Sequence, residues 1–253
     1  MSEPFEVPAH ILEAGAKALY EHQVKAARTE FEALGLGISD AKDFFLHLKQ
    51  ESDAALSVLS ASYIDAHLTD AWKRNMPGKS NATYDLLFDN NGPLATFSGK
   101  IRVAHGLGWL TDELASSLHV LRKIRNRFAH DPYKQQMADN EINSLIASLP
   151  SREVHMLRAV GYSETLLKTF SPRLLYHLRS TVICFDVGSY MLAAPIASRR
   201  QVPVGAVLGG YDDGTKTMAE YIRTLARIVL ELAGPPDEGP FAKTYGQLSD
   251  TSS

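Results

Sequence analysis

Apolar residues recur at helical spacing along most of this chain. The clearest case spans residues 111–130, where apolar side chains return every three or four positions and charged side chains occupy the positions between them. Residues 52–73 follow the same pattern, and residues 171–194 form a longer and more continuously apolar segment. Alternation with a period of two, which would predict strands, is nearly absent. The sequence therefore predicts an all-α protein in which these three segments pack together at the centre.

Capping and loop residues divide the chain into further predicted helices. Ser39 and Thr111 are suitable N-caps, and Pro172 follows Ser171 at a first helical position. The predicted helices are residues 8–34, a segment that begins at Ser39, 52–73, a helix that ends near Gly106 or Gly108, 111–130, 139–147, 163–170, 171–194 and 216–232. Loops are predicted at 75–78, 89–93 and 201–214. We expect one helical domain over residues 1–233, and a disordered tail over 234–253 because that segment is rich in proline and glycine.

Composition and charge narrow the range of functions. The chain has 253 residues, a formal net charge of −3 and a pI near 6.3. Proteins that bind duplex DNA directly usually have a basic face and a pI above about 9. The arginines of the 111–130 segment also lie at its C-terminal end, whereas recognition helices contact bases mainly with N-terminal residues. Direct DNA binding is therefore not expected.

Other classes are disfavoured by single features of the sequence. Cys184 is the only cysteine, so no disulfide framework is predicted, and no spacing suggests a metal site or a bound cofactor. The N-terminus lacks the pattern of a signal peptide. Arg179 and Asp186 interrupt the apolar stretch over 174–196, which favours a buried helix over a membrane span. We expect a cytoplasmic protein with no membrane association.

The end of the predicted 111–130 helix combines groups that can bind phosphate and move a proton. Arg125, Asn126 and His130 lie within six residues. A guanidinium group binds phosphate bidentately, and a histidine that titrates near neutrality can accept a proton from a ribose 2′-hydroxyl. Arg122 would add a flanking phosphate contact. Arg125 and His130 are separated by about 140° around the helix, so they converge only if the last turn unwinds or two chains share a groove, which predicts a homodimer.

A purely structural role for the same helix end remains an alternative. Arg125 falls on the apolar side of the predicted helix, where a charge is unfavourable unless it is paired. Asp65 is the preferred structural partner, because Ile64 and Leu68 place it beside a core face. Asn126 would then anchor a loop, and His130 would interact with the helix dipole.

Several short motifs in register resemble the mannitol operon repressor (MltR/MtlR) family. The motifs are residues 92–101, residues 104–110 and residues 121–131, and the resemblance extends over about 40–150. That family is all-helical and is similar to the wider HEPN superfamily, many of whose members are ribonucleases with an Arg-x4–6-His motif. The resemblance maps this motif onto Arg125, Asn126 and His130, and it implies a HEPN-like helical bundle with additional N- and C-terminal helices.

The resemblance implies two different functions. Mannitol-repressor-like proteins are transcriptional regulators that act through protein partners, which predicts a cytoplasmic regulatory protein without direct DNA recognition. HEPN ribonucleases cleave RNA, which predicts a metal-independent endoribonuclease that uses Arg125, Asn126 and His130 on an RNA substrate. The sequence alone is compatible with both hypotheses.

Overall fold

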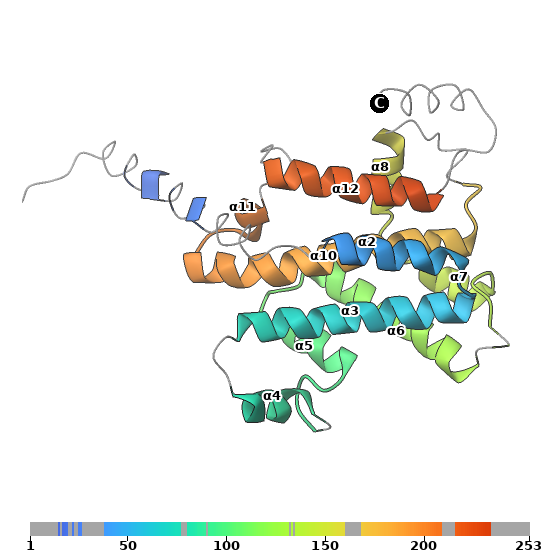
Figure 1. The fold of residues 1–253 in the computed structure, drawn as a ribbon, viewed down its shortest axis with the longest axis horizontal. Coiled ribbons are helices and arrows are strands. Elements are labelled where there is room, and N and C mark those ends of the chain that lie inside the picture. Colours follow the sequence, from blue (N-terminus) through green and yellow to red (C-terminus); the bar gives the residue numbers. More distant parts are fainter. Residues whose placement is uncertain are drawn as a thin grey trace, which may run out of the picture.

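The chain folds into a bundle of helices in the computed structural model (Figure 1). The structure describes residues 15, 17–19, 22, 25–26, 38–76, 80–89, 91–131, 133, 135–159, 168–208 and 216–233. Within these residues every regular element is a helix, which confirms the all-α prediction. The predicted tail over 234–253, and most of the helices predicted over 8–34 and 163–170, lie outside the described residues.

The described helices follow one another along the chain with these bounds: α2 (Ile38–His47), the 3-10 helix η1 (Leu48–Gln50), α3 (Asp53–Asn75), α4 (Asn81–Phe88), α5 (Phe97–Gly106), α6 (Asp112–His130), α7 (Asn140–Ala147), α8 (Arg152–Ala159), α10 (Pro172–Arg200), α11 (Val204–Leu208) and α12 (Lys216–Ala233). The bounds of α3, α6, α7 and α12 agree with the prediction to within about two residues. α2 begins one residue before Ser39, so that residue is not its N-cap.

Three short helices were not predicted from the sequence. α4 and α8 have eight residues each, and α11, inside the predicted 201–214 loop, has five. Hydrophobic periodicity needs a window of about 11–18 residues, so helices of this length give no clear signal. α10, in contrast, is longer than predicted, because it continues through Pro195 to Arg200.

Hydroxyl caps define where the three longest helices of the predicted centre begin. Ser52, Thr111 and Ser171 each accept a hydrogen bond from the backbone N–H three residues later, at 3.1, 3.2 and 3.2 Å. Such a cap satisfies one N–H that the helix itself leaves unpaired, and contributes about 1 kcal/mol. Gly108 adopts a φ of +70° in the turn between α5 and α6, a conformation that favours glycine.

The core lies where α3, α6 and α10 meet, as the sequence predicted. Each of these helices packs against the other two. α6 contributes five buried apolar residues at the predicted positions: Leu114, Leu118, Leu121, Ile124 and Phe128. A second cluster joins α10 to α8 and α12, and Figure 1 shows α12 on the other side of α10 from α6. α10 is therefore covered on more than one side.

The charged residues of α10 are compensated inside the bundle. Arg179 donates from Nε to Glu153 Oε1 at 2.9 Å and from Nη1 to the Ile146 carbonyl at 2.6 Å. Asp186 accepts from Arg152 Nη1 at 2.7 Å. Among the described helices, α10 alone has the length and hydropathy of a membrane span, but 89% of its apolar window is buried inside the protein. This burial agrees with the predicted core helix.

Burial also changes the pKa of Asp186, the partner of Arg152. Desolvation of Asp186 raises the pKa of its carboxyl to about 6, although the Arg152 guanidinium acts in the opposite direction. A second carboxylate, that of Glu113, contacts the same guanidinium at 2.6 Å and raises the pKa of Asp186 further. Arg152 therefore links α8 to both α6 and α10.

The proline inside α10 is accommodated by a side chain from α3. Pro195 has no N–H, so it cannot donate to the carbonyl of Met191 one turn earlier. Asn75 Nδ2 donates to that Met191 carbonyl at 3.0 Å, and also to the Ala71 carbonyl at 2.9 Å. The amide at the end of α3 therefore supplies the donor that α10 lacks, and ties the two helices together.

We expect Asn75→Ala to lower the free energy of unfolding by about 1–2 kcal/mol, because it leaves the Met191 carbonyl without a donor. In a Pro195→Ala background, residue 195 regains an N–H, and the Asn75→Ala loss is expected to shrink by at least half. Urea unfolding of the four proteins in this double-mutant cycle measures the coupling. Equal Asn75→Ala losses in both backgrounds would contradict this role.

Candidate functional site

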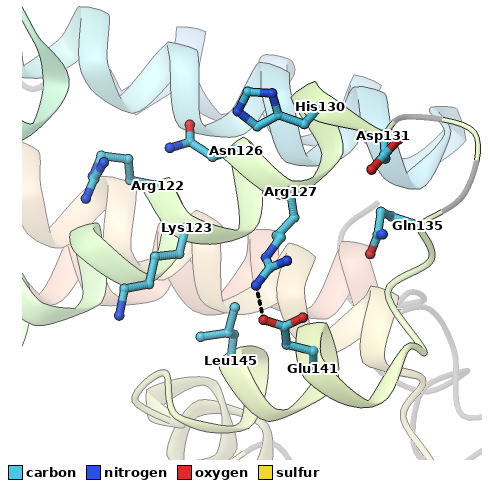
Figure 2. Close-up of a pocket in the computed structure, with 9 residues that line it drawn as sticks. All are labelled: Arg122, Lys123, Asn126, Arg127, His130, Asp131, Gln135, Glu141 and Leu145. Carbon is cyan, nitrogen blue, oxygen red and sulfur yellow. Dashed lines mark hydrogen bonds and ion pairs between the residues drawn. The ribbon is translucent and has the colours of Figure 1, made fainter.

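An open hollow of about 650 Å³ lies along the C-terminal half of α6 (Figure 2). α6 contributes five of its lining residues, the loop after α6 contributes two, and α7 contributes two. In chain order they are Arg122, Lys123, Asn126, Arg127, His130, Asp131, Gln135, Glu141 and Leu145. Eight of the nine lining residues have a polar or charged side chain, among them three permanent cations and two carboxylates, and the aliphatic parts of these long side chains form much of the wall.

The packing of α6 decides which of its residues face the hollow. Leu121, Ile124 and Phe128 are fully buried and fix the rotation of the helix about its axis. Residues 122, 126 and 130 are spaced four apart on the opposite, polar part of the helix, so they form one stripe. Figure 2 shows the Asn126 amide and the His130 ring on the same side of α6, with Arg122 nearer the N-terminus of the helix.

α6 ends at the hollow because of the residue that follows Asp131. A residue before proline avoids the helical conformation, and Asp131 has φ −136° and ψ 67°. His130 is therefore the last helical residue. The chain turns away here, so Asp131 and Gln135 line the hollow next to His130 (Figure 2).

One ion pair closes the side of the hollow toward α7. Arg127 donates to Glu141, and Figure 2 shows both side chains between the two helices. The two side chains are 52% and 62% exposed. An exposed pair of this kind contributes at most about 1 kcal/mol to stability. Its larger consequence here is that the charge of Arg127 is already neutralised.

Arg122 and Lys123 form no ion pair with any described residue. The Nε atom of Arg122 is buried and has no hydrogen-bond acceptor within the part of the chain that the structure describes. The pKa of the nearby His119 is lowered, first by burial and then by the positive charges of Arg122, Arg102 and Lys123. This part of α6 therefore carries uncompensated positive charge in a protein whose net charge is negative.

Arg125 lies outside the hollow, and its predicted pairing with Asp65 is wrong. Its side chain is exposed and donates from Nη1 to Asn126 Oδ1 at 3.1 Å. Asp65 instead accepts from Lys100 Nζ at 2.7 Å. Helical spacing put Arg125 near the apolar side of α6, but in the last turns the bundle covers only Ile124 and Phe128, and Arg125 and Ala129 at the edge of that side are exposed.

The structure thus brings together only part of the predicted set. Asn126, His130 and Arg122 share one hollow, while Arg125 contacts it only through Asn126. The sequence analysis missed Lys123 and Arg127 as lining residues, although a helical projection places them one turn apart on the same side. It had no signal for Glu141, because that residue reaches the hollow only through the packing of α7.

Comparison with known proteins relates the central part of the chain to a family of regulators. Residues 79–171, which include α4 to α8 and this hollow, match the mannitol repressor (MtlR) family. The matched segment is a little over a third of the chain, and it begins and ends later than the predicted 40–150. Asp65 therefore lies outside it. No curated protein and no solved structure matches the chain.

Removal of Asp65 and removal of Lys100 are expected to lower the free energy of unfolding by different amounts. The Lys100 side chain is 8% exposed and that of Asp65 is 31% exposed. Asp65→Ala leaves a buried ammonium group without its partner, so we expect a loss of about 2–3 kcal/mol. Lys100→Met removes the buried charge and leaves a carboxylate that water reaches, so we expect a loss below about 1 kcal/mol. Urea unfolding of both variants checks the order, and a larger loss for Lys100→Met would contradict it.

Proposed function

We propose that this chain is a cytoplasmic regulatory protein that controls transcription through protein partners. The observation that carries the proposal is the match of residues 79–171 to the mannitol repressor family. The name of that family describes repressors, and the matched segment includes five of the described helices. The proposal therefore transfers a repressor-like role to this chain.

Two features of the matched segment support action through a protein partner. α4 has no buried residue, and Leu86 on this helix is 77% exposed. Contiguous exposed apolar surfaces mark protein–protein contacts, and in this proposal α4 with Leu86 is part of the surface that the partner covers. The basic residues of α6, in contrast, lie at its C-terminal end beside two carboxylates, which is unfavourable for insertion into a DNA groove.

Transcript profiling combined with partner capture tests this role. Deletion of the gene in its host is expected to change a defined set of transcripts at least two-fold, and the wild-type chain is expected to restore them. Leu86→Glu should weaken both restoration and capture of the partner. Leu59→Glu is the matched control, because Leu59 is 42% exposed on α3, outside the matched segment.

Purified protein without its partner should not bind the promoters of those genes specifically. An unchanged transcript profile after deletion would overturn the regulatory role. Specific promoter binding by the purified chain alone would overturn the protein-partner mechanism, while the regulatory role would stand.

A metal-independent ribonuclease is the second candidate, because Asn126 and His130 share a hollow with Arg122. In this scheme His130 accepts the proton of a ribose 2′-hydroxyl, and the resulting oxygen attacks the adjacent phosphorus. The bond to the 5′-oxygen breaks, that oxygen takes up a proton, and a cyclic phosphate remains. Arg122 would hold the phosphate and Asn126 would position it. Arg125 donates to Asn126 at the edge of the hollow and would contact the scissile phosphate from there, and we propose a homodimer as the oligomeric state of this candidate.

RNA cleavage in excess EDTA tests this candidate. We expect wild-type protein to cleave single-stranded RNA, and His130→Ala to reduce the rate at least 100-fold. Circular dichroism and light scattering establish that both proteins are folded and of equal size. Equal cleavage by the two proteins, or none by the wild type, would exclude His130 as a catalytic residue.

A further inference from the structure

The hollow along α6 is lined by several hydrogen-bond donors and cations that can bind an anionic group. Arg122 and Lys123 are adjacent, and neither forms an ion pair with a described residue. Asn126 accepts from Arg125 through Oδ1, which leaves its amide nitrogen available as a donor. His130 lies one turn further along the same stripe (Figure 2). A guanidinium, an ammonium and an amide N–H suit the several acceptor oxygens of a phosphate group, and the imidazole adds a polar group at the other end of the hollow.

Arg122 is the strongest single indication that an anion binds here. Its Nε atom is buried with no acceptor among the described residues. A buried donor without a partner costs about 1–3 kcal/mol, and more when the group is charged. A ligand oxygen at this position would remove that penalty. The same anion would offset the positive charge that Arg122, Arg102 and Lys123 place around His119.

A carboxylate at the rim favours a small ligand over a polymer. Glu141 is paired with Arg127 on the side of α7, whereas Asp131 lies beyond His130 (Figure 2). An RNA strand carries a negative charge on each nucleotide, so Asp131 would repel a neighbouring phosphate. The volume of about 650 Å³ is also within the range of about 300–1,000 Å³ that small-molecule sites occupy.

We propose that this hollow binds the phosphate group of a small phosphorylated molecule, with Arg122 and Lys123 as the charged contacts and Asn126 as a hydrogen-bond donor, while His130 at the end of α6 faces the remainder of the ligand. The polar groups of Asp131 and Gln135 face the remainder of the ligand. The site does not depend on the partner-mediated role proposed above, nor on RNA cleavage, so each can fail without the others.

Calorimetric titration with inorganic phosphate, at an ionic strength held constant with sodium chloride, tests the site. We expect saturable binding by the full-length protein, and a dissociation constant at least ten-fold higher for Arg122→Gln. Lys123→Gln should weaken binding several-fold, and it provides a second variant at an exposed position if Arg122→Gln is unstable. Arg227→Gln is the matched control, because it removes one exposed positive charge from α12 and should leave binding unchanged.

A second titration distinguishes a small phosphorylated molecule from an RNA strand as the source of the phosphate group. Uridine 5′-monophosphate is expected to bind with the same dependence on Arg122 as inorganic phosphate. A ten-residue oligouridylate without terminal phosphates should bind more weakly than the monophosphate. Absence of saturable phosphate binding, or equal weakening by Arg227→Gln, would overturn the site. If the oligonucleotide binds more tightly than the monophosphate, and Arg122→Gln abolishes that binding, the ligand of this site is RNA and not a small molecule.

Discussion

Burial of α10 against α3 and α6 is the constraint on which the rest of the bundle depends. Most of this 29-residue helix is removed from water, including Arg179, Asp186 and a proline. Each of these requires a partner from another helix, because an uncompensated charge or carbonyl in a core is unfavourable. Glu153 and Arg152 of α8 and Asn75 of α3 supply those partners. The positions of α3 and α8 are therefore fixed by polar contacts as well as by apolar packing.

The same core explains why the hollow is where it is. The apolar stripe of α6 is held in the bundle along its length, while the polar stripe faces outward toward solvent and α7. Arg127 and Glu141 span the gap between α6 and α7, and the proline after Asp131 ends α6 at the rim. The hollow thus lies where α6 ends beside α7, and the cations of α6 line its surface.

Particular residues show which features of the fold the sequence patterns predicted and which they did not. The long helices and the buried stripe of α6 were predicted because each extends over several turns, so that periodicity and a capping hydroxyl agree. The short α4 and α8 were missed because one or two turns give too few positions to define a period. Arg125 was assigned to the core side from its angle on the helix. That angle says nothing about whether a neighbouring helix extends far enough to cover the position.

Local information in the chain was therefore sufficient for the helical class, for the three central helices and for the stripe of Arg122, Asn126 and His130, since each of these depends on the spacing of residues within a single helix. The partner of Asp65, the donor for the Met191 carbonyl and the contribution of Glu141 to the hollow depended on the tertiary structure. Those contacts join residues 35, 116 and 14 positions apart. No local rule decides which of several possible charges or amides comes within 3 Å or so of another, because the packing of whole helices sets that distance.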